Sequence, residues 1–116
     1  MTRKRFLTIC EGGACRSVAM ALQLKMSTDQ DAIAASWKWN SAETLAMLME
    51  WADYIILMER HFMEKVPGIG RFKDKVRIID VGPDVYGHPF NMQLNVYLKS
   101  VAEGWRESGF SIASNL

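Results

Sequence analysis

The segment Thr8–Met20, which reads TICEGGACRSVAM, decides the fold that the chain is expected to adopt. Apolar residues lead up to Cys10 and predict a buried strand over residues 6–10. Two consecutive glycines then break the pattern, and residues 16–26 carry apolar side chains at helical spacing. We therefore predict a strand, a tight loop and a helix, with a thiol and an arginine at the two ends of the loop.

Strands and helices are predicted to alternate along the rest of the chain. Because strands that alternate with helices form parallel sheets, we predict a single α/β domain over residues 1–116, in which a four-stranded parallel sheet has helices on both faces. Further strands are expected at residues 31–36, 53–58 and 75–81, and a loop at residues 68–72. A helix is expected after Asn40, which would cap it with Glu43 as its capping-box partner. The last helix carries an apolar stripe that consists of Phe90, Leu94, Tyr97, Leu98, Val101 and Trp105.

Composition excludes several classes of protein. The chain has 116 residues, of which 49% are hydrophobic and 23% charged, with a formal net charge of +1. This balance gives no reason to expect a nucleic-acid or membrane partner. The N-terminus is basic and then apolar, but its apolar run is too short for a signal peptide and Glu11 follows at once. With no export signal, both cysteines are expected to be thiols in a reducing cytoplasm.

The loop after the first strand has the features of an anion site. Successive backbone N–H groups in a tight turn form an anion-binding nest, and glycines permit the dihedral angles that such a turn needs. The start of the helix adds free N–H groups and a positive dipole end. The arginine adds a planar fork of donors that matches two phosphate oxygens. The predicted phosphate-binding residues are Glu11, Gly12, Gly13, Ala14, Cys15 and Arg16.

Cys10 stands at the base of this loop and is predicted to be a nucleophile. A thiol at a helix N-terminus and near a guanidinium ionises more easily than a free one. A thiolate beneath a bound phosphate attacks phosphorus. The Ser17 hydroxyl is expected to donate to that thiolate and to stabilise it as a leaving group. The loop at residues 82–90 follows the last strand, so it is expected at the same edge of the sheet as Cys10.

Residues 10–17 form the pattern Cys-x4-Cys-Arg-Ser directly after the first strand. This pattern resembles the signature of the low-molecular-weight protein tyrosine phosphatase family. The resemblance implies a flavodoxin-like, phosphatase I-like fold and a phosphocysteine intermediate on Cys10, with Arg16 binding the phosphoryl oxygens. It also implies that Cys15 is the second cysteine, which forms a reversible disulfide with the nucleophile.

The general acid of that family is an aspartate in a loop after the last strand, in an Asp-Pro-Tyr-like setting. Here the loop reads Pro83, Asp84, Val85, Tyr86, Gly87. The resemblance therefore implies that Asp84 is the acid and that Tyr86 flanks the substrate ring. An acid is needed because the leaving oxygen must gain a proton as the P–O bond breaks. Asp80 is the alternative acid.

Two tryptophans are further candidates for the wall of a substrate pocket. Trp37 and Trp39 alternate, so they point to the same face if the chain is extended there. They would then flank an aromatic ring, although plain packing explains them as well. A zinc set of Cys10, Cys15, His61 and His88 is rejected because the two histidines lack the usual pairing; no metal and no cofactor are expected.

Three functions are compatible with these residues. The leading one is a phosphatase for phosphate monoesters, above all phosphotyrosine, with a phosphorylated protein or a small aryl phosphate as substrate. Arsenate reductase on the same scaffold is an alternative, but a chain with only two cysteines would have an incomplete disulfide relay. A non-catalytic phosphate- or phosphopeptide-binding module is the other alternative, against which the combination of thiol, arginine and acid argues.

Overall fold

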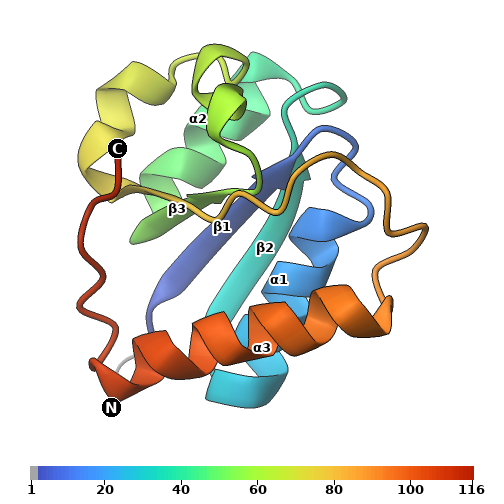
Figure 1. The fold of residues 1–116 in the computed structure, drawn as a ribbon. Coiled ribbons are helices and arrows are strands. Elements are labelled where there is room, and N and C mark those ends of the chain that lie inside the picture. Colours follow the sequence, from blue (N-terminus) through green and yellow to red (C-terminus); the bar gives the residue numbers. More distant parts are fainter. Residues whose placement is uncertain (1–2) are drawn as a thin grey trace.

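A four-stranded sheet lies at the centre of the structure, a computed structural model that describes residues 3–116 (Figure 1). In this sheet β1 (Arg5–Cys10) lies between β2 (Asp31–Ser36) and β3 (Tyr54–Leu57), and β4 (Val76–Ile78) pairs with β3. Every pairing is parallel, so the carboxyl ends of all four strands meet at one edge. The predicted four-stranded parallel sheet is confirmed.

Helices cover both faces of the sheet, as predicted. α1 (Arg16–Thr28) and α3 (Met92–Glu107) pack against each other on one face, while α2 (Ala42–Trp51) packs with the 3₁₀ helix η2 (Ile69–Lys75) on the other (Figure 1). Another 3₁₀ helix, η1 (Arg60–Glu64), lies between β3 and η2 in the chain. The connections β1–α1–β2 and β2–α2–β3 run in opposite directions across the sheet, and because both are right-handed crossovers they lie on opposite faces.

β1 is the centre of the core. Phe6, Leu7 and Ile9 are fully buried, as expected for a parallel strand that is covered on both faces. The Thr8 hydroxyl donates a hydrogen bond of 2.7 Å to the carbonyl oxygen of Ser17, which ties the middle of β1 to the start of α1. These contacts hold the end of the strand, and therefore Cys10, in a defined place.

Two of the predicted local features differ from the structure around α2. The cap of α2 is Ser41, whose Oγ accepts a hydrogen bond of 3.1 Å from the Thr44 N–H. Asn40 is not the cap, because its side-chain oxygen accepts instead from the Ser36 N–H at 2.7 Å. The segment 68–72, predicted as a loop, is largely part of the 3₁₀ helix η2.

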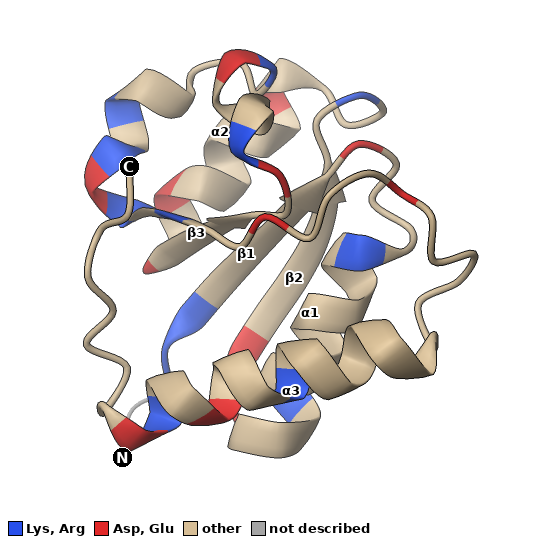
Figure 2. Ribbon diagram, viewed as in Figure 1, with Lys and Arg blue, Asp and Glu red and all other residues tan. Residues whose placement is uncertain are grey.

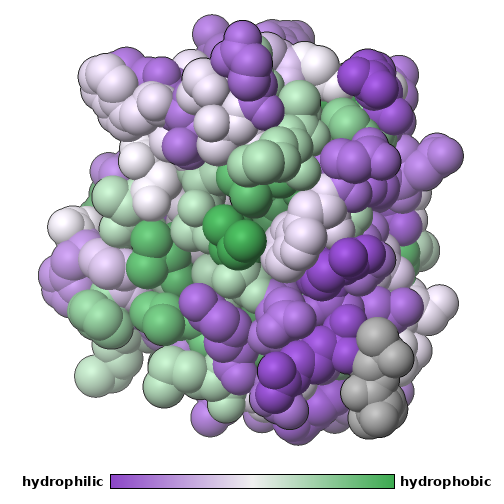
Figure 3. Space-filling model, turned by 180° about the vertical axis from the view of Figure 1, so that it is seen from behind, coloured by the Kyte–Doolittle hydropathy of each residue, from purple (hydrophilic) through white to green (hydrophobic). Residues whose placement is uncertain are grey.

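The apolar stripe of the last helix is shorter than predicted. Leu94 and Leu98 are buried, but Phe90 is 72% exposed and lies before the helix. Asn91 caps α3 by accepting a hydrogen bond of 3.0 Å from the Leu94 N–H, so the helical periodicity begins only after Phe90. Tyr97 lies at the edge of the stripe and is 50% exposed. When the molecule is seen from behind, hydrophobic residues are exposed across the centre and left of the surface (Figure 3).

The charged residues are interspersed on the loops at the carboxyl edge of the sheet, while residues 92–98 at the start of α3 carry no charge (Figure 2). None of the helices in residues 3–116 combines the length and the apolar character needed to cross a bilayer.

Candidate active site

Residues 11–15 form a tight loop between β1 and α1, and the Cys10 thiol lies at its base. The Sγ atom accepts a hydrogen bond of 3.2 Å from the backbone N–H of Gly13. The thiol itself donates to the Ser17 hydroxyl at 3.0 Å. Cys10 is 2% exposed and Ser17 is fully buried. The predicted contact between thiol and hydroxyl is therefore present, and both groups are held by the surrounding structure.

The start of α1 leaves its first N–H groups free for an anion. Cys15 is the N-cap, and its side chain makes no capping hydrogen bond. The first turn contains no acidic residue and begins with Arg16. A cation at this end opposes the helix dipole, and a bound anion would compensate for both.

Arg16 is held in the interior by groups that leave one edge of its guanidinium unpaired. It is 2% exposed, and its Nη1 donates to the carboxylate of Glu59 and to the carbonyl oxygen of Gly82, the latter at 2.8 Å. The centroid of the Phe62 ring lies 5.5 Å from Cζ. Its Nε is buried and has no hydrogen-bond partner in residues 3–116. A buried unpaired donor on a charged group is costly, and an oxyanion would satisfy it.

Glu59 is a residue that the sequence reasoning missed. Its side chain is 13% exposed, and its second oxygen lies 3.5 Å from His61 Nδ1. Its position in the sequence could have identified it, because Glu59 is the first charged residue after the apolar run of β3. It therefore lies at the carboxyl edge of the parallel sheet, where ligands bind in such folds.

Ser36, at the end of β2, supports the loop from the side and was also missed. Its hydroxyl donates to the carbonyl oxygen of Glu11 and accepts from the Trp39 N–H at 2.8 Å. Gly13 has a φ of +65°, and a Cβ atom on it would lie 2.9 Å from both Cβ and N of Ser36. A glycine is therefore required at this position by conformation and by space.

Substituting Gly13 tests this close approach. Gly13→Ala is expected to weaken the binding of inorganic phosphate by at least about tenfold, because the strain of a positive φ costs about 1–3 kcal/mol and the clash displaces the loop. Gly12→Ala is the matched control, since nothing lies within 4 Å of a Cβ atom there. Isothermal titration calorimetry gives both affinities; equal losses in the two variants would contradict a specific role for Gly13.

Asp84 reaches the thiol loop from the segment between β4 and α3. Its carboxylate lies close to the Cys15 thiol, and burial, together with the negative charge of Asp84, raises the pKa of that thiol to about 11. Cys15 is therefore protonated at neutral pH. The predicted convergence of the loop at residues 82–90 with the loop at residues 11–15 is present in the structure.

Asp80, the alternative acid, is engaged elsewhere. Its Oδ1 accepts a hydrogen bond of 3.0 Å from the Gly82 N–H, and its Oδ2 accepts one of 3.2 Å from the Arg60 N–H. Both oxygens thus hold backbone groups of neighbouring loops. Asp84 is the aspartate of the two whose charge acts on the Cys15 thiol in that loop.

Tyr86 is tied into its own loop. Its hydroxyl donates a hydrogen bond of 2.6 Å to the carbonyl oxygen of Val81, and its carbonyl oxygen accepts from the Asn91 side chain at 3.0 Å. These contacts brace the segment that carries Asp84. A place for Tyr86 beside a substrate ring remains a prediction.

The two tryptophans do not share a face, because residues 37–39 form a turn rather than an extended segment. Trp37 is half-buried, with its ring centroid 5.7 Å from that of Phe62, whereas Trp39 is 73% exposed and lies beside Lys38. The premise of alternation was wrong here, and their role as pocket walls remains a prediction. Lys38 also lies 3.7 Å from the carboxylate of Glu11, at the mouth of the loop.

The two histidines and the two cysteines belong to separate surroundings. His61 lies beside Glu59, and His88 Nδ1 accepts a hydrogen bond of 3.1 Å from the Phe90 N–H. Within residues 3–116 no group of three or more histidine, cysteine and acidic side chains is arranged to hold a metal ion.

This strand order, with the thiol loop after β1 and an acidic loop at the same edge, is the fold of the low-molecular-weight protein tyrosine phosphatases. Wzb from Vibrio vulnificus in complex with benzylphosphonate is similar with a TM-score of 0.71 and 15% identity, over 92% of this chain and 99% of that one. The tyrosine phosphatase Wzb from Escherichia coli K30 in complex with phosphate is similar with a TM-score of 0.68 and 18% identity, over 92% and 99% of the two chains.

The YwlE arginine phosphatase from Geobacillus stearothermophilus is also similar, with a TM-score of 0.65 and 16% identity over 97% of this chain and 99% of that one. The sequence matches no family model and no curated protein. The likeness is therefore one of fold.

Proposed function

We propose that this protein is a cysteine-dependent phosphatase that hydrolyses phosphate monoesters, above all phosphotyrosine, through a phosphocysteine intermediate on Cys10. The observation that carries the proposal is the buried guanidinium of Arg16. Its Nε is unpaired among the described residues, and Arg16 directly follows a loop built around a thiol. A buried cation with a free donor edge is arranged to receive a dianionic group with several oxygens.

In the first step Cys10, whose thiol has released its proton to solvent, attacks phosphorus as the thiolate. The S–P bond forms as the P–O bond to the leaving group breaks, and Asp84 transfers a proton to the departing oxygen. Arg16 and the backbone N–H groups of residues 11–16 stabilise the charge on the equatorial oxygens. The position of Asp84 beside Cys15 supports its role as the acid.

In the second step the Asp84 carboxylate accepts a proton from water, whose oxygen attacks phosphorus. The S–P bond breaks, phosphate is released and the thiolate of Cys10 is restored. The Ser17 hydroxyl, which lies 3.0 Å from the sulfur, donates to that thiolate and makes it a better leaving group. Glu59 acts through Arg16: it holds Nη1 and so leaves the Nε edge for the phosphoryl group.

We further propose that Tyr86, Trp37 and Trp39 lie at the mouth of the site and contact an aromatic leaving group. The Wzb neighbour that binds benzylphosphonate supports an aryl substrate. Cys10 and Cys15, both free thiols in the structure, are proposed to form a reversible disulfide. A peroxide oxidises the Cys10 thiolate to a sulfenic acid, and the Cys15 thiol displaces water from it as the S–S bond forms. The thiols of a reducing cytoplasm would break that bond again.

An aryl phosphate assay separates the three candidate functions. We expect release of inorganic phosphate from a phenyl phosphate or a phosphotyrosine peptide, with phosphate and arsenate as competitive inhibitors and no consumption of thiols. Stoichiometric oxidation of added thiols in the presence of arsenate would identify an arsenate reductase instead. Phosphate binding by calorimetry without any turnover would identify a binding module.

A further inference from the structure

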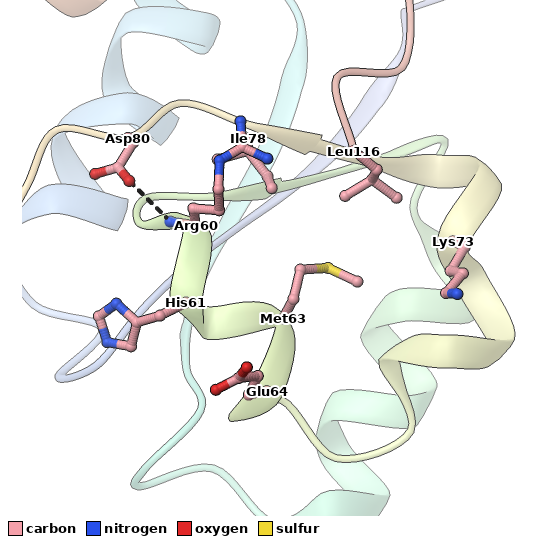
Figure 4. A pocket seen from close by; sticks show the side chains of 8 residues that line it. All are labelled: Arg60, His61, Met63, Glu64, Lys73, Ile78, Asp80 and Leu116. Carbon is pink, nitrogen blue, oxygen red and sulfur yellow. Dashed lines mark hydrogen bonds between the residues drawn. The ribbon is translucent and has the colours of Figure 1, made fainter.

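A cavity of about 740 Å³ lies beside η1, and none of its lining residues belongs to the thiol loop at residues 11–15 (Figure 4). Its apolar floor consists of Met63, Ile78 and Leu116, which come from η1, β4 and the C-terminal segment. Two cationic side chains, Arg60 and Lys73, stand on opposite sides of Met63 (Figure 4). His61, Glu64 and Asp80 complete the lining, so polar groups surround an apolar floor, an arrangement that occurs in small-molecule sites.

The acidic side chains at the cavity oppose these cations only in part. Asp80 keeps its negative charge, but it is bound to the Arg60 N–H at 3.2 Å and the Gly82 N–H at 3.0 Å and lies on the side of Arg60 away from Lys73 (Figure 4). The Arg60 guanidinium donates from Nη1 to the carbonyl oxygen of Asn115 at 3.2 Å. Glu64 lies on the side of Met63 away from Ile78 (Figure 4). The part of the cavity between Arg60 and Lys73 therefore suits an anionic group.

The walls of this cavity are continuous with the groups that hold Arg16. Glu59 binds Nη1 of Arg16, and the next residue, Arg60, lines the cavity. Gly82 binds the same nitrogen through its carbonyl oxygen, and Asp80, two residues earlier, also lines the cavity. Asp80 connects the two segments through its hydrogen bonds to the Arg60 and Gly82 N–H groups (the first is dashed in Figure 4).

We propose that this cavity is a second ligand site, for an organic anion with an apolar body, and that its occupation strengthens oxyanion binding at Arg16. The apolar body covers the floor, and the anion lies between Arg60 and Lys73. A ligand packed against Arg60 and Asp80 holds both segments in the arrangement that positions Glu59 and Gly82, so it favours the state that binds phosphate. The coupling, but not the ligand site, rests on the proposed function of the thiol loop.

The dye 8-anilinonaphthalene-1-sulfonate has the required chemistry and reports its own binding by fluorescence. We expect the dye to bind the folded protein, and saturating inorganic phosphate to tighten its binding by at least about fivefold, the lower end of typical coupling between sites. Calorimetry should show that the dye tightens phosphate binding by the same factor, because such coupling is reciprocal. A dye that occupied the thiol loop would be displaced by phosphate, so weaker dye binding overturns the proposal. Unchanged dye binding in a protein that calorimetry shows to bind phosphate overturns the coupling.

Charge-reversal variants locate the site. Lys73→Glu is expected to weaken dye binding by at least about fivefold, because attraction for the sulfonate becomes repulsion. Lys99→Glu makes the same charge change on α3, outside the cavity, and should bind the dye as the unchanged protein does. Equal losses in the two variants would show unspecific attraction and would overturn the site.

Two Asp80 variants test the route of the coupling. Asp80→Ala should still bind the dye but lose the effect of phosphate, while Asp80→Asn, which keeps one acceptor, should retain part of it. Circular dichroism and thermal unfolding establish that each variant is folded. Full coupling in folded Asp80→Ala would overturn the route. Turnover is not measured in any arm, so a protein that binds phosphate without hydrolysing esters would leave this proposal standing.

Discussion

Replacing Cys10 with serine is expected to abolish turnover while phosphate binding remains. A serine hydroxyl is a far weaker nucleophile than a thiolate, and loss of a catalytic nucleophile costs about 10⁶-fold in well-studied hydrolases, so the rate with an aryl phosphate should fall by at least about 10⁴-fold. The affinity for phosphate should stay within about threefold, because the loop N–H groups and Arg16, which supply the binding energy, are unchanged. Steady-state kinetics and calorimetry give the two quantities.

Cys15→Ser is the matched control, because it makes the same change five residues away. A serine at this position keeps a donor for Asp84, so this variant should lose much less activity than Cys10→Ser. Trapping with a rapid quench should show a phosphorylated intermediate on Cys10 in the unchanged protein. Full activity in Cys10→Ser, or a label on Cys15, would refute the proposed nucleophile.

Asp84→Asn is expected to have the second-largest effect, and that effect should depend on the leaving group. If Asp84 protonates the departing oxygen, the variant should lose about 10²–10⁴-fold on phenyl or alkyl phosphates, the range usual for general acid catalysis. Substrates with an acidic phenol leave without help and should lose far less.

Asp80→Asn is the control for this experiment. Because both Asp80 oxygens accept backbone hydrogen bonds, its substitution is expected to lower thermal stability without changing the dependence on the leaving group. The opposite pattern, in which Asp80→Asn shows that dependence and Asp84→Asn does not, would assign the acid role to Asp80.

Local patterns in the sequence were sufficient for the architecture and for the thiol loop. The apolar runs that became β1 and β3, and the helical spacing after Arg16, are set by short-range preferences and by the need to cover both faces of a parallel sheet. The segment 31–36 was predicted with its observed bounds. The predicted start of α2 was wrong by one residue, because Asn40 and Ser41 are both suitable N-cap residues and the local sequence does not distinguish them.

By itself, the sequence determined the order of the elements and the chemical identity of the loop, because both depend on residues close together in the chain. Only the tertiary structure decided which distant groups surround that loop. Glu59 and Gly82 contact Arg16, and Ser36 packs against Gly13, although the partners in these pairs are 23 to 66 positions apart. The approach of the loop at residues 82–90 was expected from the order of the strands, but its contacts were not. Local periodicity carries no information on such pairs. The parallel sheet creates them, because it brings the carboxyl ends of all its strands to one edge.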